Sequence, residues 1–302
     1  MERMKATDFP QEVLSLYDRY IHGGISRREF IEGAGKFTVG GLTGAAIFEA
    51  LAPNYAWSQQ VPANDRRIRV EKITYPSPQG SGTMGGLLAR PAQGTRFPAV
   101  VVVHENRGLN PYQEDVVRRF AAAGFIAFGP DALHPLGGYP ASSAYDAVND
   151  AKATEMQRTL DPRKVTEDFV AAANFMRTHP QSNGKVAATG FCFGGGMANT
   201  LAVRVPELVA SAPYYGNQPA AADVPKIKAT MLIHYAETDE RINAGWPAYE
   251  AALKAAGVKY EAHIYPGTQH GFHNDTTPRY SELAAKLSWQ RTVDLFTRTT
   301  KA

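Results

Sequence analysis

The chain has 302 residues, of which 44% are hydrophobic and 20% charged, the proportions of an ordinary globular protein. Its formal net charge is +3, and no lysine- and arginine-rich cluster alternates with aromatic residues, so nothing indicates nucleic-acid binding. The single cysteine excludes an intramolecular disulfide framework and a zinc site built from several thiolates.

The first sixty residues differ in character from the rest of the chain. Arg27 and Arg28 precede a weakly apolar, Gly- and Ala-rich stretch from about Val39 to Ala52. This order is typical of a twin-arginine export signal and predicts a periplasmic location, with a cytoplasmic one as the alternative. Glu49 interrupts the apolar stretch and no clean A-x-A site follows, so a helical arm packed on the domain or on a second subunit is the other interpretation. The stretch is too short and too polar for a stable membrane anchor.

We therefore expect an N-terminal segment over residues 1–60 and a main domain over residues 61–302, with a homodimer left open. The domain opens with two predicted strands, 64–76 and 82–91, joined by a Gly/Ser/Pro turn. Residues 97–105 then form a valine-rich apolar run, which indicates a strand covered on both faces, as in a parallel sheet.

Strands and helices alternate from there to the end of the domain. Helices are predicted at 111–124, 163–180, 195–206, 246–257 and 280–299, and strands at 125–131, 185–192, 208–216, 228–239 and 259–267. Strict alternation predicts an α/β fold with a doubly wound, mostly parallel sheet and helices on both faces. Residues 132–161 are polar and Gly-rich, and we expect them to shape the mouth of a pocket at the carboxyl ends of the strands.

The cysteine lies in a pattern typical of a reactive nucleophile. Residues Gly190 to Gly194 have the order G-x-C-x-G, directly after a predicted strand and before a predicted helix. Small residues at both ends let strand and helix approach closely at a strained turn, which holds the nucleophile clear of the sheet. The N-terminus of the next helix favours the thiolate form of Cys192. A buried, unreactive cysteine is the alternative.

A thiol with an ordinary pKa of about 8.5 is mostly un-ionised at neutral pH and benefits from a base. His270 follows the last predicted strand, between Gly267 and Gly271, and Asp239 follows another strand. The chain order Cys192, Asp239, His270 is that of the nucleophile, acid and histidine of α/β-hydrolases, although an Asp after a strand is also a common helix cap. The remaining histidines are assigned to packing (His234, His263), to the vicinity of the site (His104, His273), or to loops and the surface (His22, His134, His179).

From Arg67 to Ala302 the chain resembles the dienelactone hydrolase (carboxymethylenebutenolidase) family of α/β-hydrolases. The resemblance lies in "HENRGLNPYQED", "AAGFIAFGPD", "NGKVAATGFCFGGG", "HYAETD" and "GTQHGF", most of which stand at predicted strand ends. It is closest to a subgroup with an exported-looking "GISRREF" segment. The resemblance implies the α/β-hydrolase fold and hydrolysis of a small ester or lactone, without a cofactor or metal.

The resemblance also implies roles for individual residues. Cys192 attacks a carbonyl carbon, His270 carries protons and is oriented by Asp239, and Glu105 helps to ionise the thiol when substrate arrives. A structural acid paired with Arg107 is the alternative for Glu105.

Further residues are assigned to binding the substrate and its oxyanion. The backbone N–H groups of Asn106 and Phe193 are expected to form the oxyanion hole. Arg107, Tyr139 and Phe272 are expected to contact substrate, with ordinary packing as the alternative for the aromatic side chains.

The sequence departs from the family where two arginines bind the carboxylate of the lactone. One of these stands four residues after the catalytic histidine, where this chain has Asn274. The second has no clear counterpart, although Lys152 and Arg158 are near the expected place and Arg107 or Arg279 could compensate.

The sequence thus predicts a cysteine-dependent hydrolase of an ester or lactone that works through a thioester acyl-enzyme. A thioesterase or peptidase on the same scaffold remains open. So does a non-catalytic protein whose thiol senses oxidants by forming a sulfenic acid.

Overall fold

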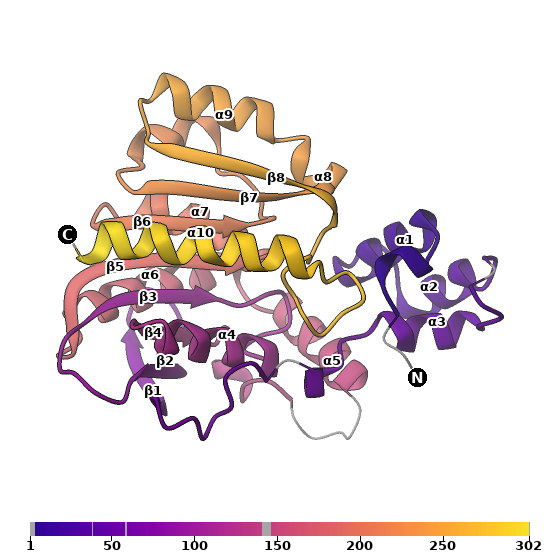
Figure 1. The fold of residues 1–302 in the computed structure, drawn as a ribbon, viewed down its shortest axis with the longest axis horizontal. Helices are drawn as coiled ribbons and strands as arrows, with labels where there is room; N and C mark the ends of the chain where they lie inside the picture. The colour runs from indigo at the N-terminus through magenta and orange to yellow at the C-terminus, as the bar shows by residue number, and fades with distance from the viewer. Residues whose placement is uncertain (1–3, 38, 58, 141–145, 302) are drawn as a thin grey trace.

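The computed structural model describes residues 4–37, 39–57, 59–140 and 146–301. Within them, eight strands form one sheet in the order β1-β2-β4-β3-β5-β6-β7-β8 (Figure 1). The strands are β1 (Ile68–Ser77), β2 (Gly82–Pro91), β3 (Phe97–Val103), β4 (Ile126–Pro130), β5 (Ser182–Phe191), β6 (Leu208–Tyr214), β7 (Thr230–Thr238) and β8 (Tyr260–Gln269). The pairs of β2 with β1 and β4 are antiparallel, and all other pairs are parallel, as in the predicted α/β-hydrolase fold.

The helices of the main domain follow the predicted alternation, with additions. They are α4 (Pro111–Ala122), α5 (Asp146–Arg158), α6 (Pro162–Thr178), α7 (Phe193–Arg204), α8 (Glu240–Asn243), α9 (Trp246–Ala255) and α10 (Glu282–Lys301). Short 3-10 helices occur at Ala6–Asp8, Tyr55–Trp57, His134–Leu136 and Ala221–Lys226. Helix α5 lies in the polar stretch whose course the sequence did not predict, and residues 141–145 of that stretch lie outside the described residues.

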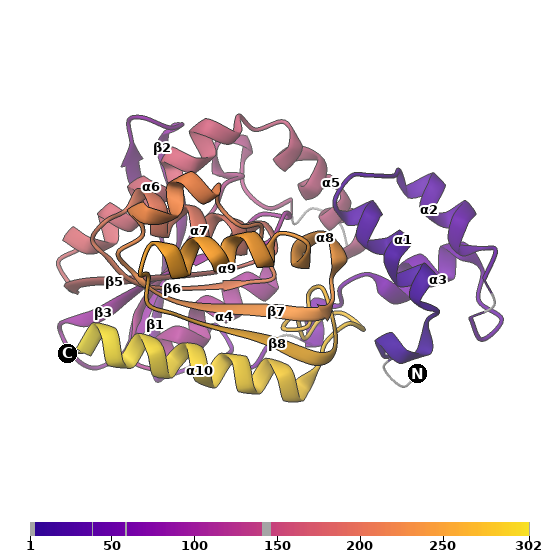
Figure 2. The same ribbon diagram turned by 90° about the horizontal axis from the view of Figure 1, so that it is seen from above.

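The apolar run of β3 is buried on both faces, as predicted. Val101 and Val103 belong to the core shared with α6, α7 and α9, whereas Val100 and Val102 belong to the core shared with α4 and α10. Figures 1 and 2 show these two groups of helices on opposite sides of the sheet. Because successive side chains of a strand point to opposite faces, a central strand between two helix layers must be apolar at every position.

Helix α7 packs unusually close to the sheet at the cysteine. A Cβ atom on Gly190 would collide with the carbonyl of Gly194, and one on Gly194 with the carbonyl of Val103. A Cβ on Gly195 would likewise collide with the carbonyl of Tyr214 on β6. This confirms that the glycines around Cys192 serve the close approach of strand and helix.

The N-terminal segment forms three short helices, α1 (Gln11–Ile21), α2 (Arg27–Ala34) and α3 (Gly44–Leu51). They share a small apolar core that includes Val13, Tyr17, Phe30, Ile47 and Phe48. In both views they lie together at one end of the sheet, beside α5 and α8 (Figures 1 and 2). None of the helices in the described ranges has the length and apolar character needed to cross a membrane.

The paired arginines stand in the first turn of α2. Ser26 caps this helix and Glu29 completes a capping box. Arg28 pairs with Glu32 at 2.8 Å, and the Arg27 guanidinium lies over the ring of Phe48. Export by the twin-arginine route stays a prediction.

We expect Gly194→Ala to destabilise the protein by about 1–3 kcal/mol, because the new methyl group meets a backbone carbonyl that cannot move aside. Thermal and denaturant unfolding measure the effect. Gly196→Ala is the matched control on the same helix, since its Cβ would make ordinary contacts with Asn217 and alanine favours helix by about 1 kcal/mol. Equal stability of the two variants would contradict the assignment.

Candidate active site

Cys192 is held in a strained turn between β5 and α7. Its backbone angles are φ 57° and ψ −113°, a combination that residues with a side chain rarely adopt. Cys192 is the residue directly before the first turn of α7. Such a conformation costs roughly 1–3 kcal/mol and persists only where the surroundings impose it. The side chain is buried, with 7% of its surface exposed. This is the strained strand-to-helix turn that the G-x-C-x-G pattern predicts.

His270 and Asp239 meet at the ends of neighbouring strands. The Nδ1 atom of His270 lies 2.6 Å from Oδ2 of Asp239, and both side chains are buried. A carboxylate in this position holds the ring so that Nε2 is the nitrogen that exchanges protons. That Nε2 atom is buried and has no hydrogen-bond partner among the described residues. It lies within 4.8 Å of the Cys192 sulfur.

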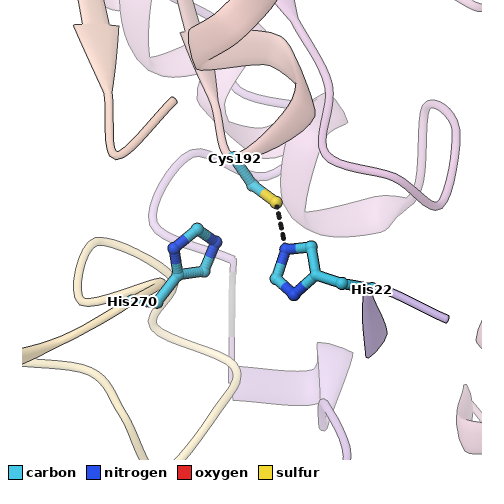
Figure 3. A group of neighbouring side chains, drawn as sticks. All are labelled: His22, Cys192 and His270. Carbon is cyan, nitrogen blue, oxygen red and sulfur yellow. Dashed lines mark hydrogen bonds between the residues drawn. The ribbon is translucent and has the colours of Figure 1, made fainter. Parts of the chain in front are cut away.

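His22 also contacts the sulfur, contrary to the expectation that it lies in a loop or on the surface. Its Nε2 atom is 3.3 Å from Sγ of Cys192, which places it in the site beside His270 (Figure 3). The two imidazole rings stand edge to face, with centroids 5.0 Å apart. The sequence carries no local signal for this contact, because His22 ends a helix of a segment that lies 170 positions from the cysteine.

The two imidazoles reverse the effect of burial on the thiol. Burial alone raises the pKa of Cys192, but His270 and His22 outweigh it and hold the pKa well below its ordinary value. For His270, burial lowers the pKa, and the Asp239 carboxylate and the sulfur together raise it to about 10. For His22, the sulfur and Asp18 outweigh burial and raise the pKa. The arrangement favours the thiolate form of Cys192.

Glu105 is buried next to the site, at the end of β3. Its Oε2 atom accepts a 3.0 Å hydrogen bond from Asn274 Nδ2, and burial raises its pKa despite the opposing charge of Arg107. Asn274, four residues after His270, thus contacts Glu105 through its side-chain amide. The ion pair that Arg107 makes at 3.1 Å is with Asp150.

A pocket of about 270 Å³ opens beside the thiol. Cys192, Asn106 and Phe193 all line it, so the two residues assigned to the oxyanion hole face the same space as the nucleophile. Its wall also includes Arg158 of α5, which confirms that the stretch 132–161 helps to shape the pocket.

The other residues assigned to substrate binding do not line this pocket. Arg107 is buried in its pair with Asp150, which also accepts a 2.9 Å hydrogen bond from the Tyr139 hydroxyl. Phe272 is fully buried and packs against the ring of Tyr215. In the structure, Arg107 thus forms an ion pair, and Tyr139 and Phe272 take part in packing. Packing was the alternative interpretation for these two aromatic side chains.

Two other histidines lie near the nucleophile, as expected. The ring of His104 stacks on Phe193 and that of His273 packs against Phe191. Both are buried and hydrogen-bonded, and burial lowers the pKa of each.

Cys192, His22 and His270 are also the group among the described residues whose donor atoms are close enough to share a metal ion. A metal there would occupy the nucleophile and both imidazoles at once. That no metal takes part in the reaction stays a prediction.

The comparison with known proteins agrees with this geometry. A model of the dienelactone hydrolase family matches residues 84–300. The chain belongs to the dienelactone hydrolase family. A second model, described as YqhI-like, matches residues 1–37 of the N-terminal segment.

Individual relatives extend the comparison. The hydrolase fragment YghX of Escherichia coli K12 is 52% identical over 122 residues, which are 40% of this chain and 98% of the fragment. A Yersinia pestis protein named as a carboxymethylenebutenolidase is 30% identical, covering 76% of this chain and 89% of its own. A solved structure named as a dienelactone hydrolase of Klebsiella pneumoniae has a TM-score of 0.64 at 24% identity, over 76% of this chain and 99% of the other. This last likeness shows the shared fold.

We expect Asp239→Asn to lower the pKa of His270 from about 10 towards its ordinary value, because the carboxylate that raises it is gone. The thiol pKa rises in turn, and kcat/KM for p-nitrophenyl acetate falls roughly a hundred- to ten-thousandfold. NMR titration of the ring and steady-state kinetics measure the two effects. Glu240→Gln, the same change at the next and exposed residue, is the control. An unchanged His270 pKa would rule out the pairing as its cause.

Proposed function

We propose that this hydrolase of the dienelactone hydrolase family cleaves ester or lactone bonds by nucleophilic catalysis, with Cys192, His270 and Asp239 as its triad. The observation that carries the proposal is the thiol of Cys192, which is buried at a strained turn with His22 Nε2 at 3.3 Å and with the Asp239-bound ring of His270 beside it. A buried charge is costly unless it is paired, so the arrangement is expected where a thiolate is used.

In the proposed reaction the Cys192 thiolate attacks the carbonyl carbon of the substrate. The backbone N–H groups of Asn106 and Phe193 donate hydrogen bonds to the oxyanion that forms. As the carbon–oxygen bond breaks, His270 gives the proton on Nε2 to the leaving oxygen, and a thioester remains on Cys192.

Hydrolysis of the thioester reverses these roles. The neutral ring of His270 takes a proton from water as the water oxygen attacks the thioester carbon. The carbon–sulfur bond then breaks, which returns the thiolate, releases the carboxylic acid and leaves His270 protonated again. Asp239 stabilises the charged ring in each half of the cycle.

We expect Cys192→Ala to lose p-nitrophenyl acetate hydrolysis by at least about a thousandfold, because no other side chain takes the place of the nucleophile. His270→Gln is expected to accumulate an acetyl group on Cys192, since deacylation needs the base. Mass spectrometry of the intact protein and of the peptide with Cys192 detects it. Hydrolysis by Cys192→Ala at the wild-type rate would end the proposal.

The charge of the pocket favours a substrate that carries a carboxylate. Arg158 and Arg241 line the space beside Cys192, and no acidic side chain is among the described residues of its wall. Arg158 is near the expected place of one of the family's two carboxylate-binding arginines, which has no clear counterpart in the sequence. A guanidinium binds a carboxylate through charge-assisted hydrogen bonds, which makes both arginines candidates for that role.

We expect Arg158→Gln to raise KM for mono-p-nitrophenyl succinate about tenfold, the effect of losing one charge-assisted hydrogen bond. KM for the neutral p-nitrophenyl butyrate changes little. Arg163→Gln, an exposed site on α6, serves as the matched control. Equal effects on both esters would remove Arg158 from substrate recognition.

A further inference from the structure

We propose that His22 is a second catalytic histidine, supplied by the N-terminal segment, which takes the proton of the Cys192 thiol and keeps the sulfur ionised. The inference rests on the proposed function, since it concerns the same nucleophile. It starts from one contact: Nε2 of His22 lies 3.3 Å from the sulfur, within hydrogen-bond distance (Figure 3). A ring nitrogen of His270 lies within 4.8 Å of the same sulfur, so two imidazoles from distant parts of the chain face it.

The His22 ring is oriented in the manner of a general base. Its Nδ1 atom lies 2.8 Å from the backbone carbonyl oxygen of Asp18 and 3.3 Å from the Asp18 carboxylate. A carbonyl oxygen only accepts, so Nδ1 carries the hydrogen and Nε2 is the basic nitrogen that faces the sulfur. His22 and Asp18 therefore repeat, from another part of the chain, the relation of His270 to Asp239.

Helix α1 contacts the catalytic domain at both of its ends, at Gln11 and at Ile21. The side chain of Asn106, an oxyanion-hole residue, donates a 2.5 Å hydrogen bond to the carbonyl oxygen of Ile21. The Gln11 side chain pairs with that of Gln269, the last residue before His270. These contacts give the N-terminal segment a defined register against the site.

The charges around His22 come from several elements. Asp18 lies on its own helix, Cys192 and His270 face its ring, and Arg241 of α8 donates a 3.0 Å hydrogen bond to Nε2. The Arg241 contact fits the neutral ring, since a guanidinium cannot accept. The Arg241 side chain is 40% exposed, and its Nε atom also lies 3.8 Å from the Asp18 carboxylate.

Two further arginines belong to this surrounding. Arg279 lies 3.9 Å from the Asp18 carboxylate, and Arg158 of α5 reaches the turn that follows His22 at Gly23. Both are permanently charged, so the groups that titrate together are the sulfur and the two imidazoles.

The two histidines then have separate tasks. The thiol proton moves from Sγ to Nε2 of His22, which leaves a thiolate and an imidazolium in contact. His270 gives its own proton to the leaving oxygen and recovers one from water. His22 keeps the thiol proton through the cycle and stabilises the thiolate when the carbon–sulfur bond breaks.

The test is the pH dependence of thiol alkylation by iodoacetamide in the full-length protein. The chain has one cysteine, so incorporated label reports on Cys192 alone. In His22→Gln we expect the midpoint of the rate profile to rise by about one pH unit or more, and the rate at pH 6 to fall about tenfold. His179→Gln makes the same change at the far end of β5 and keeps the wild-type profile.

A second variant guards against misfolding of the first. Asp18→Asn leaves the imidazole in place but removes its carboxylate, so a smaller rise in the same direction is expected if His22 acts as proposed. Circular dichroism and thermal unfolding establish that each variant is folded. Wild-type alkylation profiles in folded His22→Gln, or in Asp18→Asn if the first does not fold, would overturn the inference.

Alkylation and esterase kinetics together distinguish failure of the His22 inference from failure of the proposed hydrolase function. The alkylation profile needs no turnover, so it reports on His22 even if Cys192→Ala retains its esterase activity. If both proposals hold, His22→Gln lowers kcat/KM for p-nitrophenyl acetate most strongly below pH 7, where the thiol of the variant is protonated. A pH-independent loss would indicate a purely structural role and would also count against the inference.

Discussion

The site depends on one interaction, the contact between the buried sulfur of Cys192 and the imidazoles of His22 and His270 that face it. A thiol removed from water is normally harder to ionise, because its charged form loses its hydration. Here burial is present, yet the pKa of Cys192 is lowered, so the neighbouring imidazoles outweigh the loss of solvent. Burial also strengthens the attraction, since charges interact more strongly in a medium of low dielectric constant. Burial therefore has two effects: it disfavours the thiolate form by removing water, and it strengthens the attraction between the thiolate and the imidazoles.

For this contact, the sulfur must project from the junction between a strand and a helix, where the backbone has neither strand nor helix geometry. The strained backbone at Cys192 projects the side chain from the junction of β5 and α7, and the absence of side chains at Gly190 and Gly194 makes the junction sterically feasible. The strain is maintained by the sheet: β3 and β6 approach the glycines of the turn through the backbone carbonyls of Val103 and Tyr214. The fold therefore stabilises the position of the nucleophile with contacts that are themselves unrelated to the chemistry.

The N-terminal segment is part of this arrangement. It has a small core of its own, and it also contributes Ile21 and His22 to the pocket wall and anchors Asn106. A chain without its first sixty residues would lose Ile21 and His22 from the pocket wall. The predicted export signal and the folded N-terminal helices therefore lead to conflicting expectations. Removal of the segment on export would also remove part of the pocket wall.

The sequence was enough to predict the sheet, its helix layers and the meeting of Cys192, Asp239 and His270, because these depend on local signals. The valine run of β3 predicts burial on two faces, and glycines mark the turn of Cys192 and the loop of His270. Residues at the ends of parallel strands meet at one edge, so chain order alone brings Cys192, Asp239 and His270 together. The aromatic substrate contacts were less predictable, since the same side chains pack equally well in a core, where the structure places Phe272.

The contacts of the Cys192 sulfur with His22, and the arginines in the pocket wall, became known only from the tertiary structure. His22 ends a short helix at the far end of the chain, and its position depends on how a separate helical group docks on the sheet. The arginines of the pocket wall come from α5 and α8, and the position of α5 is likewise set by packing against distant segments. Docking of this kind arises from many weak contacts spread along the sequence. No local sequence pattern predicts how these helices dock. The strained turn at Cys192, in contrast, is predicted by a few neighbouring residues.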